Sequence, residues 1–171
     1  MPIEFGTDGW RGVVGEDYTA ENVRICAQGT ADLMREQGLA ARGLVVGYDT
    51  RLDSEKFAVA VAEVSTANDI VTFLCDKAST TPAVAYNVVA RDAGAGVVIT
   101  ASHNPACWNG FKYKPNYGGS ASPEIIERLE TLINENRQSK NLNLASSNEA
   151  QHKGDIAYID PADLPSLAHS N

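Results

Sequence analysis

The stretch from residue 97 to residue 114, VVITASHNPACWNGFKYK, holds the side chains best suited to chemistry. An apolar run ends in Ser102 and His103, and two cations, Lys112 and Lys114, follow within a dozen residues. A hydroxyl and an imidazole can take part in group and proton transfer, and ammonium groups neutralise developing negative charge. These residues form the first candidate site, and the role of Ser102 decides what it does.

Ser102 has three interpretations. It can be a turn residue, because Asn-Pro at 104–105 is itself a turn signal. It can be a hydrolase nucleophile, but that motif needs glycine two residues away on each side, where Thr100 and Asn104 stand. It can carry a phosphoryl group, whose nearly two negative charges need nearby cations. Only this third interpretation uses the cations that the sequence offers, which are Arg11, Lys112, Lys114 and Arg51.

A second group of functional residue types lies at residues 5–12, FGTDGWRG. Its glycines fall at every third position, so the backbone can approach a ligand closely while a tight loop carries Arg11. Arginine suits bidentate recognition of phosphate, although such a motif alone is more often a glycine-rich turn with a structural ion pair. No Walker lysine motif occurs, and GAGVVI at 94–99 precedes a strand, so neither nucleotide-binding fingerprint is present.

The spacing of apolar residues predicts the elements that position these groups. Steps of three and four residues predict helices at 19–38, 53–69, 82–92 and from 123 onward. Short β-branched runs predict strands at 43–49, 70–75 and 95–100, with 155–159 as a further strand. This alternation indicates an α/β fold, a three-layer α/β/α domain with a mostly parallel or mixed sheet.

Capping residues mark the starts of three of these helices. Asp53 or Ser54 is expected to cap the second helix, Thr81 the third and Ser122 the fourth. Ligands of open α/β sheets sit at the carboxyl ends of strands, and Ser102 follows the strand at 95–100. The predicted topology therefore places Ser102 where a ligand site is expected.

Composition excludes several classes of protein. The 171 residues suffice for one domain, or one domain with a tail, and a net charge of −8 argues against nucleic acid as a partner. The three cysteines, Cys26, Cys75 and Cys107, form no CxxC pair, which excludes a zinc site of the usual spacing and fits a reduced compartment. We find neither a signal-peptide pattern nor an apolar run of membrane-spanning length, so a cytoplasmic protein without a membrane partner is expected.

The motifs taken together resemble those of the α-D-phosphohexomutases, the superfamily of phosphoglucomutase and phosphomannomutase. FGTDGWRG, TASHNP and WNGFK carry the resemblance, supported by VVGYDTR at 45–51 and STTPAVAYNV at 79–88. The likeness covers about residues 3–135 in the family's order. Two independent motifs at the right separation make it specific.

The resemblance implies roles for individual residues. Ser102 would be the phosphoserine that donates its phosphoryl group to a sugar and contributes to binding Mg²⁺. His103, Arg11 and Lys112 would surround the transferred group, with His103 or Lys112 in proton transfer, and Lys114 would join Arg11 and Lys112 in binding substrate. The reaction would interconvert 1-phospho and 6-phospho hexoses through a sugar bisphosphate, with an activator of the glucose 1,6-bisphosphate type.

The sequence departs from the family pattern in two respects. Cys107 and Trp108 stand where the family often has an acidic residue and a tyrosine. The Asp-Gly-Asp-Gly-Asp loop, which holds Mg²⁺ in the family's second domain, does not occur. We therefore expect residues 1–140 to be the family's first domain, and residues 141–171 to be a linker toward a second domain that this chain lacks.

Two alternatives follow from these departures. The chain can be the first domain of a phosphoglucosamine mutase, because the hexose is selected by a domain outside this sequence. It can also be a stand-alone module that binds phosphate or phosphosugars without catalysis. In either case the isolated chain is expected to be inactive, with phosphorylated hexoses and the remaining domains of the same enzyme as its partners.

Overall fold

The computed structural model describes residues 3–6, 9–144 and 155–163. Two positions of the glycine motif, 7 and 8, and two parts of the predicted linker, 145–154 and 164–171, lie outside them. In chain order the elements are β1 (Trp10–Val13), α1 (Ala20–Glu36), the 3₁₀ helix η1 (Ala40–Arg42), β2 (Leu44–Tyr48), α2 (Ser54–Ala67), β3 (Thr72–Cys75), α3 (Thr81–Ala90), β4 (Ala95–Ile99), β5 (Trp108–Pro115), α4 (Pro123–Ser139) and β6 (Ile156–Ile159).

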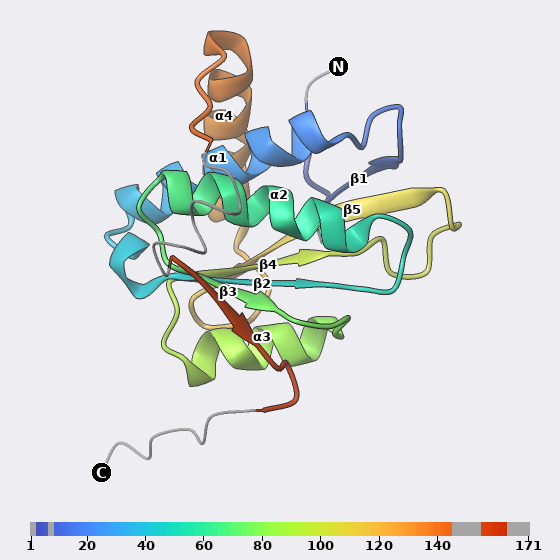
Figure 1. The fold of residues 1–171 in the computed structure, drawn as a ribbon. Helices are drawn as coiled ribbons and strands as arrows, with labels where there is room; N and C mark the ends of the chain where they lie inside the picture. Colours follow the sequence, from blue (N-terminus) through green and yellow to red (C-terminus); the bar gives the residue numbers. More distant parts are fainter. Residues whose placement is uncertain (1–2, 7–8, 145–154, 164–171) are drawn as a thin grey trace.

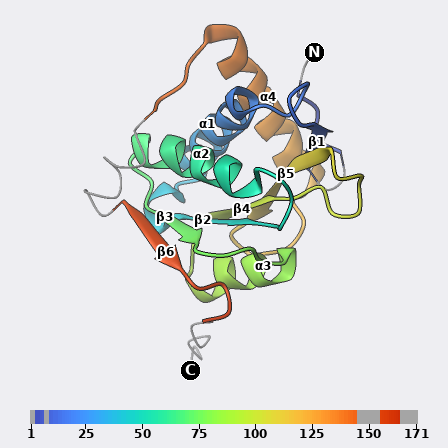
Figure 2. The same cartoon turned by 45° about the vertical axis from the view of Figure 1, so that its right-hand side comes forward.

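These elements form a mixed sheet between two helical layers, which confirms the predicted three-layer α/β/α fold. The described strands lie in the order β1-β5-β4-β2-β3-β6. β4, β2, β3 and β6 are parallel, whereas β5 runs antiparallel to both of its neighbours. In Figure 1, α1 and α2 lie above the sheet and α3 lies below it. Helix α4 packs along α1, as the turned view of Figure 2 also shows.

The central strands are apolar on both faces because helices cover both sides. Every residue of β2 and β4 is buried. Apolar residues from both helical layers complete the core around them, among them Met34, Val61, Val84 and Ile133. No helix in the described part of the chain is both long and apolar enough to cross a bilayer.

Two helix starts differ in detail from the predicted caps. Ser122 caps α4 as predicted, accepting from the Ile125 N–H. The cap of α3 is Thr80, and Thr81 is already the first helical residue. Asp53 precedes α2 but makes no side-chain cap, because it is left-handed, with φ 61°. The cap predicted at Thr81 is therefore wrong by one residue. Of the two candidates for α2, Asp53 occupies the cap position without a side-chain hydrogen bond, and Ser54 is already helical.

Two strands are missing from the prediction. β1 overlaps the end of the motif predicted to be a tight loop, and β5 covers WNGFKYKP, where charged residues mask the apolar alternation. Each becomes a strand by pairing with a distant segment, as in the register Trp10 with Phe111. The expected strand at 155–159 is confirmed as β6, which pairs with β3. It lies within the predicted linker of residues 141–171, and the domain division stays a prediction.

Helix α4 approaches α1 closely at Gly29. A Cβ atom at this position would lie 2.5 Å from Ile133 Cγ1 and 3.1 Å from Ile133 N, so the backbone of α4 leaves no room for a side chain. We expect Gly29→Val to lower the free energy of unfolding by ~3 kcal/mol, the upper end of overpacking costs. Urea unfolding followed by circular dichroism measures this change.

Removing the obstructing side chain supplies the control. Ile133→Ala alone is expected to cost about 2–5 kcal/mol because it leaves a cavity. In the double variant the new valine occupies part of that cavity, so the combined loss should fall below the sum of the two single losses. Additive losses would show that Gly29 and Ile133 are not in contact.

Candidate functional site

The loop that joins β4 to β5 presents Ser102 at the carboxyl end of a parallel strand. Both Ser102 and His103 are exposed, whereas Ala101 is fully buried and anchors the loop. Ser102 is left-handed, with φ 56°, and its N–H donates to Thr100 Oγ1 at 2.9 Å. A non-glycine residue in this conformation costs about 1–2 kcal/mol, so the surrounding structure must hold it there.

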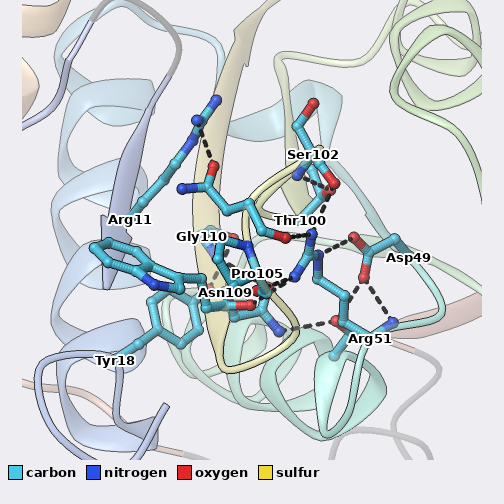
Figure 3. A network of polar contacts seen from close by, with 12 residues as sticks. Arg11, Tyr18, Asp49, Arg51, Thr100, Ser102, Pro105, Asn109 and Gly110 are labelled. Atoms are coloured by element: carbon cyan, nitrogen blue, oxygen red, sulfur yellow. Dashed lines mark hydrogen bonds and ion pairs between the residues drawn. The ribbon is translucent and has the colours of Figure 1, made fainter. Parts of the chain in front are cut away.

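Arg11 reaches this loop from β1. It lies opposite Gly110 of β5, and its Nη1 donates to Asn104 Oδ1 at 2.8 Å. Figure 3 shows the guanidinium of Arg11 and the side chain of Ser102 pointing to the same side of the loop. A Cβ at Gly110 would lie 2.6 Å from Thr100 O, so glycine allows the loop and both strands to meet closely. The structure thus brings Arg11 to the loop that carries Ser102.

Lys112 and Lys114 lie on β5 and are buried, with 6% and 7% of each residue exposed. A Cβ at Gly96 would contact Lys114 Cβ at 3.5 Å and Val88 of α3, so Lys114 lies on the sheet face that α3 covers. Alternation along the strand places Lys112 on the same face. Lys112 pairs with β4 two residues closer to Ser102 than Lys114 does. Both lysines are thus buried on one face of the sheet, and Lys112 is the one nearer to Ser102 along β4.

Tyr18 holds β5 in place from the other side. Its hydroxyl donates to the Gly110 carbonyl at 2.8 Å, and its ring stacks on Trp10 with the centroids 4.8 Å apart. Burial raises the pKa of Tyr18 well above that of a free tyrosine, so the hydroxyl keeps its proton and remains a donor. Nothing in the sequence singled out this residue as part of the site's support.

Arg51 holds the backbone of the Ser102 loop. Its Nη2 donates to the carbonyls of Ser102 at 2.7 Å and Asn104 at 2.6 Å. Its Nη1 donates to the carbonyls of Pro105 at 2.8 Å and Trp108 at 3.1 Å. The sequence offered Arg51 as one of several cations for a phosphate, and in the structure its guanidinium instead donates to loop carbonyls.

Asp49 orients Arg51 from the end of β2. Its carboxylate accepts from the Arg51 N–H at 2.9 Å and from Ser54 Oγ at 2.8 Å, and it pairs with Arg51 Nε at 3.3 Å. Ser54 Oγ in turn accepts from Asn109 Nδ2 at 2.9 Å. These contacts join the end of β2, the start of α2 and the start of β5 to one loop (Figure 3).

An open cleft of about 1020 Å³ lies beside the loop, between the segments that follow β2, β3 and β4. Hydroxyl groups line much of it, on Thr50, Ser79, Thr80, Thr81, Thr100 and Ser102. An open cleft at the carboxyl ends of parallel strands is where an α/β domain binds its ligand. Within residues 3–6, 9–144 and 155–163, no three acidic, histidine or cysteine side chains gather as a metal site requires.

Fold and site together define an α/β/α domain that presents an exposed serine on a clamped loop, with an arginine beside it. The family model for phosphoglucomutase/phosphomannomutase, alpha/beta/alpha domain I, matches residues 2–140. This chain belongs to the phosphoglucomutase/phosphomannomutase family and corresponds to its domain I.

Relatives of known name support this assignment. A phosphoglucomutase of Staphylococcus saprophyticus is 32% identical over 160 residues, covering 92% of this chain and 29% of the relative. A phosphoglucosamine mutase of Acetivibrio thermocellus is 36% identical over 135 residues, covering 78% of this chain and 30% of the relative. The chain therefore spans less than a third of the length of these relatives.

Solved structures show the same fold. A Thermus thermophilus protein described as a phosphomannomutase superposes with a TM-score of 0.73 at 32% identity, covering 78% of this chain and 30% of its own. A phosphoglucomutase/phosphomannomutase family protein of Burkholderia thailandensis gives a TM-score of 0.71 at 25% identity, covering 95% of this chain and 34% of its own. The resemblance on which the sequence predictions rest is thereby confirmed.

Proposed function

We propose that this chain is the phosphoserine-bearing domain of a phosphohexomutase, which interconverts 1-phospho and 6-phospho hexoses of the glucose or mannose type through a bisphosphorylated sugar. One observation carries the proposal. Ser102 is exposed at the carboxyl end of β4, on a loop that Arg11 contacts and beside the strand that holds Lys112. No other serine of the cleft combines these neighbours.

In the proposed reaction a sugar hydroxyl oxygen bonds to the phosphorus on Ser102 while the bond between that phosphorus and Ser102 Oγ breaks. We propose that His103 or Lys112 takes part in transferring the hydroxyl proton. The phosphate groups are neutralised and oriented by Arg11, Lys112 and Lys114. Positioning and charge stabilisation of this kind account for most of the catalysis of phosphoryl transfer. The resulting bisphosphate, of the glucose 1,6-bisphosphate type, returns its other phosphoryl group to Ser102.

Mg²⁺ fits this site only in part. A phosphoryl group on Ser102 would offer the hard oxygen ligands that Mg²⁺ prefers, and the ion would neutralise charge during transfer. The described residues provide no acidic cluster to complete the coordination shell. We therefore propose that most ligands of Mg²⁺ come from a domain outside this chain, as do the groups that select the hexose.

Two other functions remain as alternatives. The match to a phosphoglucosamine mutase at 36% identity favours an amino sugar phosphate as an alternative substrate. The second alternative is a phosphosugar-binding module without turnover. We propose a cytoplasmic location, which fits the free cysteines Cys26, Cys75 and Cys107. The phosphorylated hexose and further domains of the same enzyme are the proposed partners.

Phosphopeptide mapping tests the proposal. Protein purified from the cells that produce it is incubated with glucose 1,6-bisphosphate and Mg²⁺, and its peptides are analysed by mass spectrometry. We expect the phosphoryl group on Ser102. Ser79, which lines the same cleft, is the matched control site and should stay unmodified. Label only on another residue would contradict the assignment of Ser102, and no label at all would favour the binding module.

The isolated chain of 171 residues should fold but show no mutase turnover. In this proposal, the groups that bind the distant part of the sugar phosphate and most ligands of the metal lie in other domains. A coupled mutase assay beside a thermal melt measures both properties.

A further inference from the structure

The four carbonyl groups that converge on Arg51 belong to one short segment, residues 102–108. A guanidinium carries five N–H donors in a fixed planar arrangement. Four of them bond to these carbonyls, and Nε forms an ion pair with the Asp49 carboxylate. Carbonyl dipoles that point at one another repel unless a positive charge lies between them. The bent path of the loop therefore depends on the charge and shape of Arg51.

From this geometry we infer that Arg51 is a positioning residue, which sets the backbone conformation of the Ser102 loop and thereby aims Ser102 Oγ. Its kinetic consequence rests on the proposed phosphoryl transfer, whereas its structural consequence does not. Figure 3 shows the Ser102 carbonyl directed toward Arg51 and the side chain directed away from it. By holding the Ser102 carbonyl, Arg51 therefore sets the direction in which the Ser102 side chain points.

The left-handed conformation of Ser102 makes this grip necessary. At φ 56°, Ser102 is less stable than in an ordinary conformation by about 1–2 kcal/mol, so it relaxes unless other contacts compensate. Hydrogen bonds that involve a charged group contribute about 1.5–3 kcal/mol each, and the Ser102 carbonyl receives one of these from Arg51. Losing that contact leaves fewer interactions to oppose relaxation.

Arg51 is itself held by rigid elements. The Arg51 side chain is only 14% exposed and that of Asp49 only 23%, so solvent screens their pairing less than that of a surface pair. Asp49 directly follows β2, and Ser54 links it to Asn109 at the start of β5. The loop is therefore fixed relative to the sheet that carries Arg11 and Lys112.

Lysine is a poor substitute at this position. Its ammonium has three donors in place of five and no planar fork, so it reaches some of the four carbonyls but not all. Arg51→Lys keeps the charge and loses the geometry, whereas Arg51→Ala loses both. Arg42 supplies a matched control, because its Nε donates to the Asp92 carbonyl at 2.7 Å and it pairs with the Asp92 carboxylate. Asp92 precedes β4, whereas the Ser102 loop follows that strand.

Hydrogen exchange tests the structural part on this chain. The amides of Ser102, Asn104 and Trp108 bond within the loop to Thr100 Oγ1, Ala101 O and Pro105 O. We expect their exchange to be at least about tenfold faster in Arg51→Lys, a loss of ~1.4 kcal/mol of local stability, and unchanged in Arg42→Lys. Unchanged loop exchange in a folded Arg51→Lys variant would overturn the inference.

The effect of Arg51 on catalysis is tested by phosphorylation kinetics, with protein purified from the cells that produce it. Misplacing Ser102 Oγ by about 1 Å is expected to lower the maximal rate of Ser102 phosphorylation ~10²-fold in Arg51→Ala. The half-saturating concentration of glucose 1,6-bisphosphate should change less than about threefold, since a positioning residue acts on the loop and not on the ligand. Millimolar guanidinium should restore part of the lost rate, which no general loss of stability would allow.

The outcomes separate the two proposals. A raised half-saturating concentration with an unchanged maximal rate would make Arg51 a phosphate ligand and overturn the positioning role. If wild-type protein takes up no phosphoryl group while loop exchange still depends on Arg51, the phosphohexomutase proposal fails and the structural role of Arg51 stands. Should Arg51→Ala not fold, Arg51→Lys carries both measurements.

Discussion

Ser102→Ala is expected to abolish phosphoryl transfer between the protein and a sugar bisphosphate. The variant has no oxygen at the position where the phosphoryl group is held, so no phosphoenzyme can form and no cation can compensate. The measurement is the uptake of radiolabelled phosphate from glucose 1,6-bisphosphate, together with mutase turnover in the protein from its own cells. Both signals should fall to background.

The substitution leaves the scaffold intact, which makes the result interpretable. The backbone contacts of Ser102 to Thr100 and Arg51 remain in the alanine variant, and the side chain is exposed. Stability should therefore change by no more than about 0.5 kcal/mol. Ser79→Ala, in the same cleft, should keep full transfer. Label retained by Ser102→Ala would place the phosphoryl group on another residue.

Lys112→Met is expected to slow phosphoryl transfer about 10²–10³-fold without abolishing it. Removing one preorganised charge that stabilises a transition state typically has an effect of ~10²–10³ on rate. Methionine keeps the length and apolar stem of the buried side chain, so the charge is the main change. Single-turnover phosphorylation of Ser102 measures the rate.

Lys114→Met is the matched control for Lys112→Met. Both lysines are buried on the same face of β5, so a loss caused by packing would appear in both variants. We expect Lys114→Met to raise the half-saturating concentration of the sugar phosphate more than it lowers the rate. If Lys112→Met were as inactive as Ser102→Ala, Lys112 would be indispensable and its role as one stabiliser among several would be wrong.

Local patterns were enough to predict the parallel part of the fold. β2, β3 and β4 are short apolar runs between helices with clear periodicity, and such signals depend on neighbouring residues alone. β1 and β5 carry no such signal, because glycine, arginine and lysine interrupt them and their strand character comes from pairing with each other. Long-range pairing is what sequence periodicity does not encode.

The residue types of the candidate site could be predicted from the sequence, but the role of each residue could not. Ser102, Arg11 and Lys112 stand in recognisable motifs, so their presence near one another could be expected. The motif around Arg51 indicates a cation but not what that cation binds, because its partners are backbone carbonyls that every residue possesses. Tyr18 was missed for the same reason, since it binds the carbonyl of Gly110.

The pairing of β1 with β5 has a consequence for the order of folding. Trp10 lies opposite Phe111, so nearly the whole domain separates two adjacent strands, and closing that long loop is entropically unfavourable until the intervening chain is compact. Strands β2 to β4 meet over far shorter separations and can assemble first. A nascent chain that has formed this nucleus but not yet recruited its first strand would lack Arg11. The candidate site is therefore completed late in folding, when β1 brings Arg11 to the Ser102 loop.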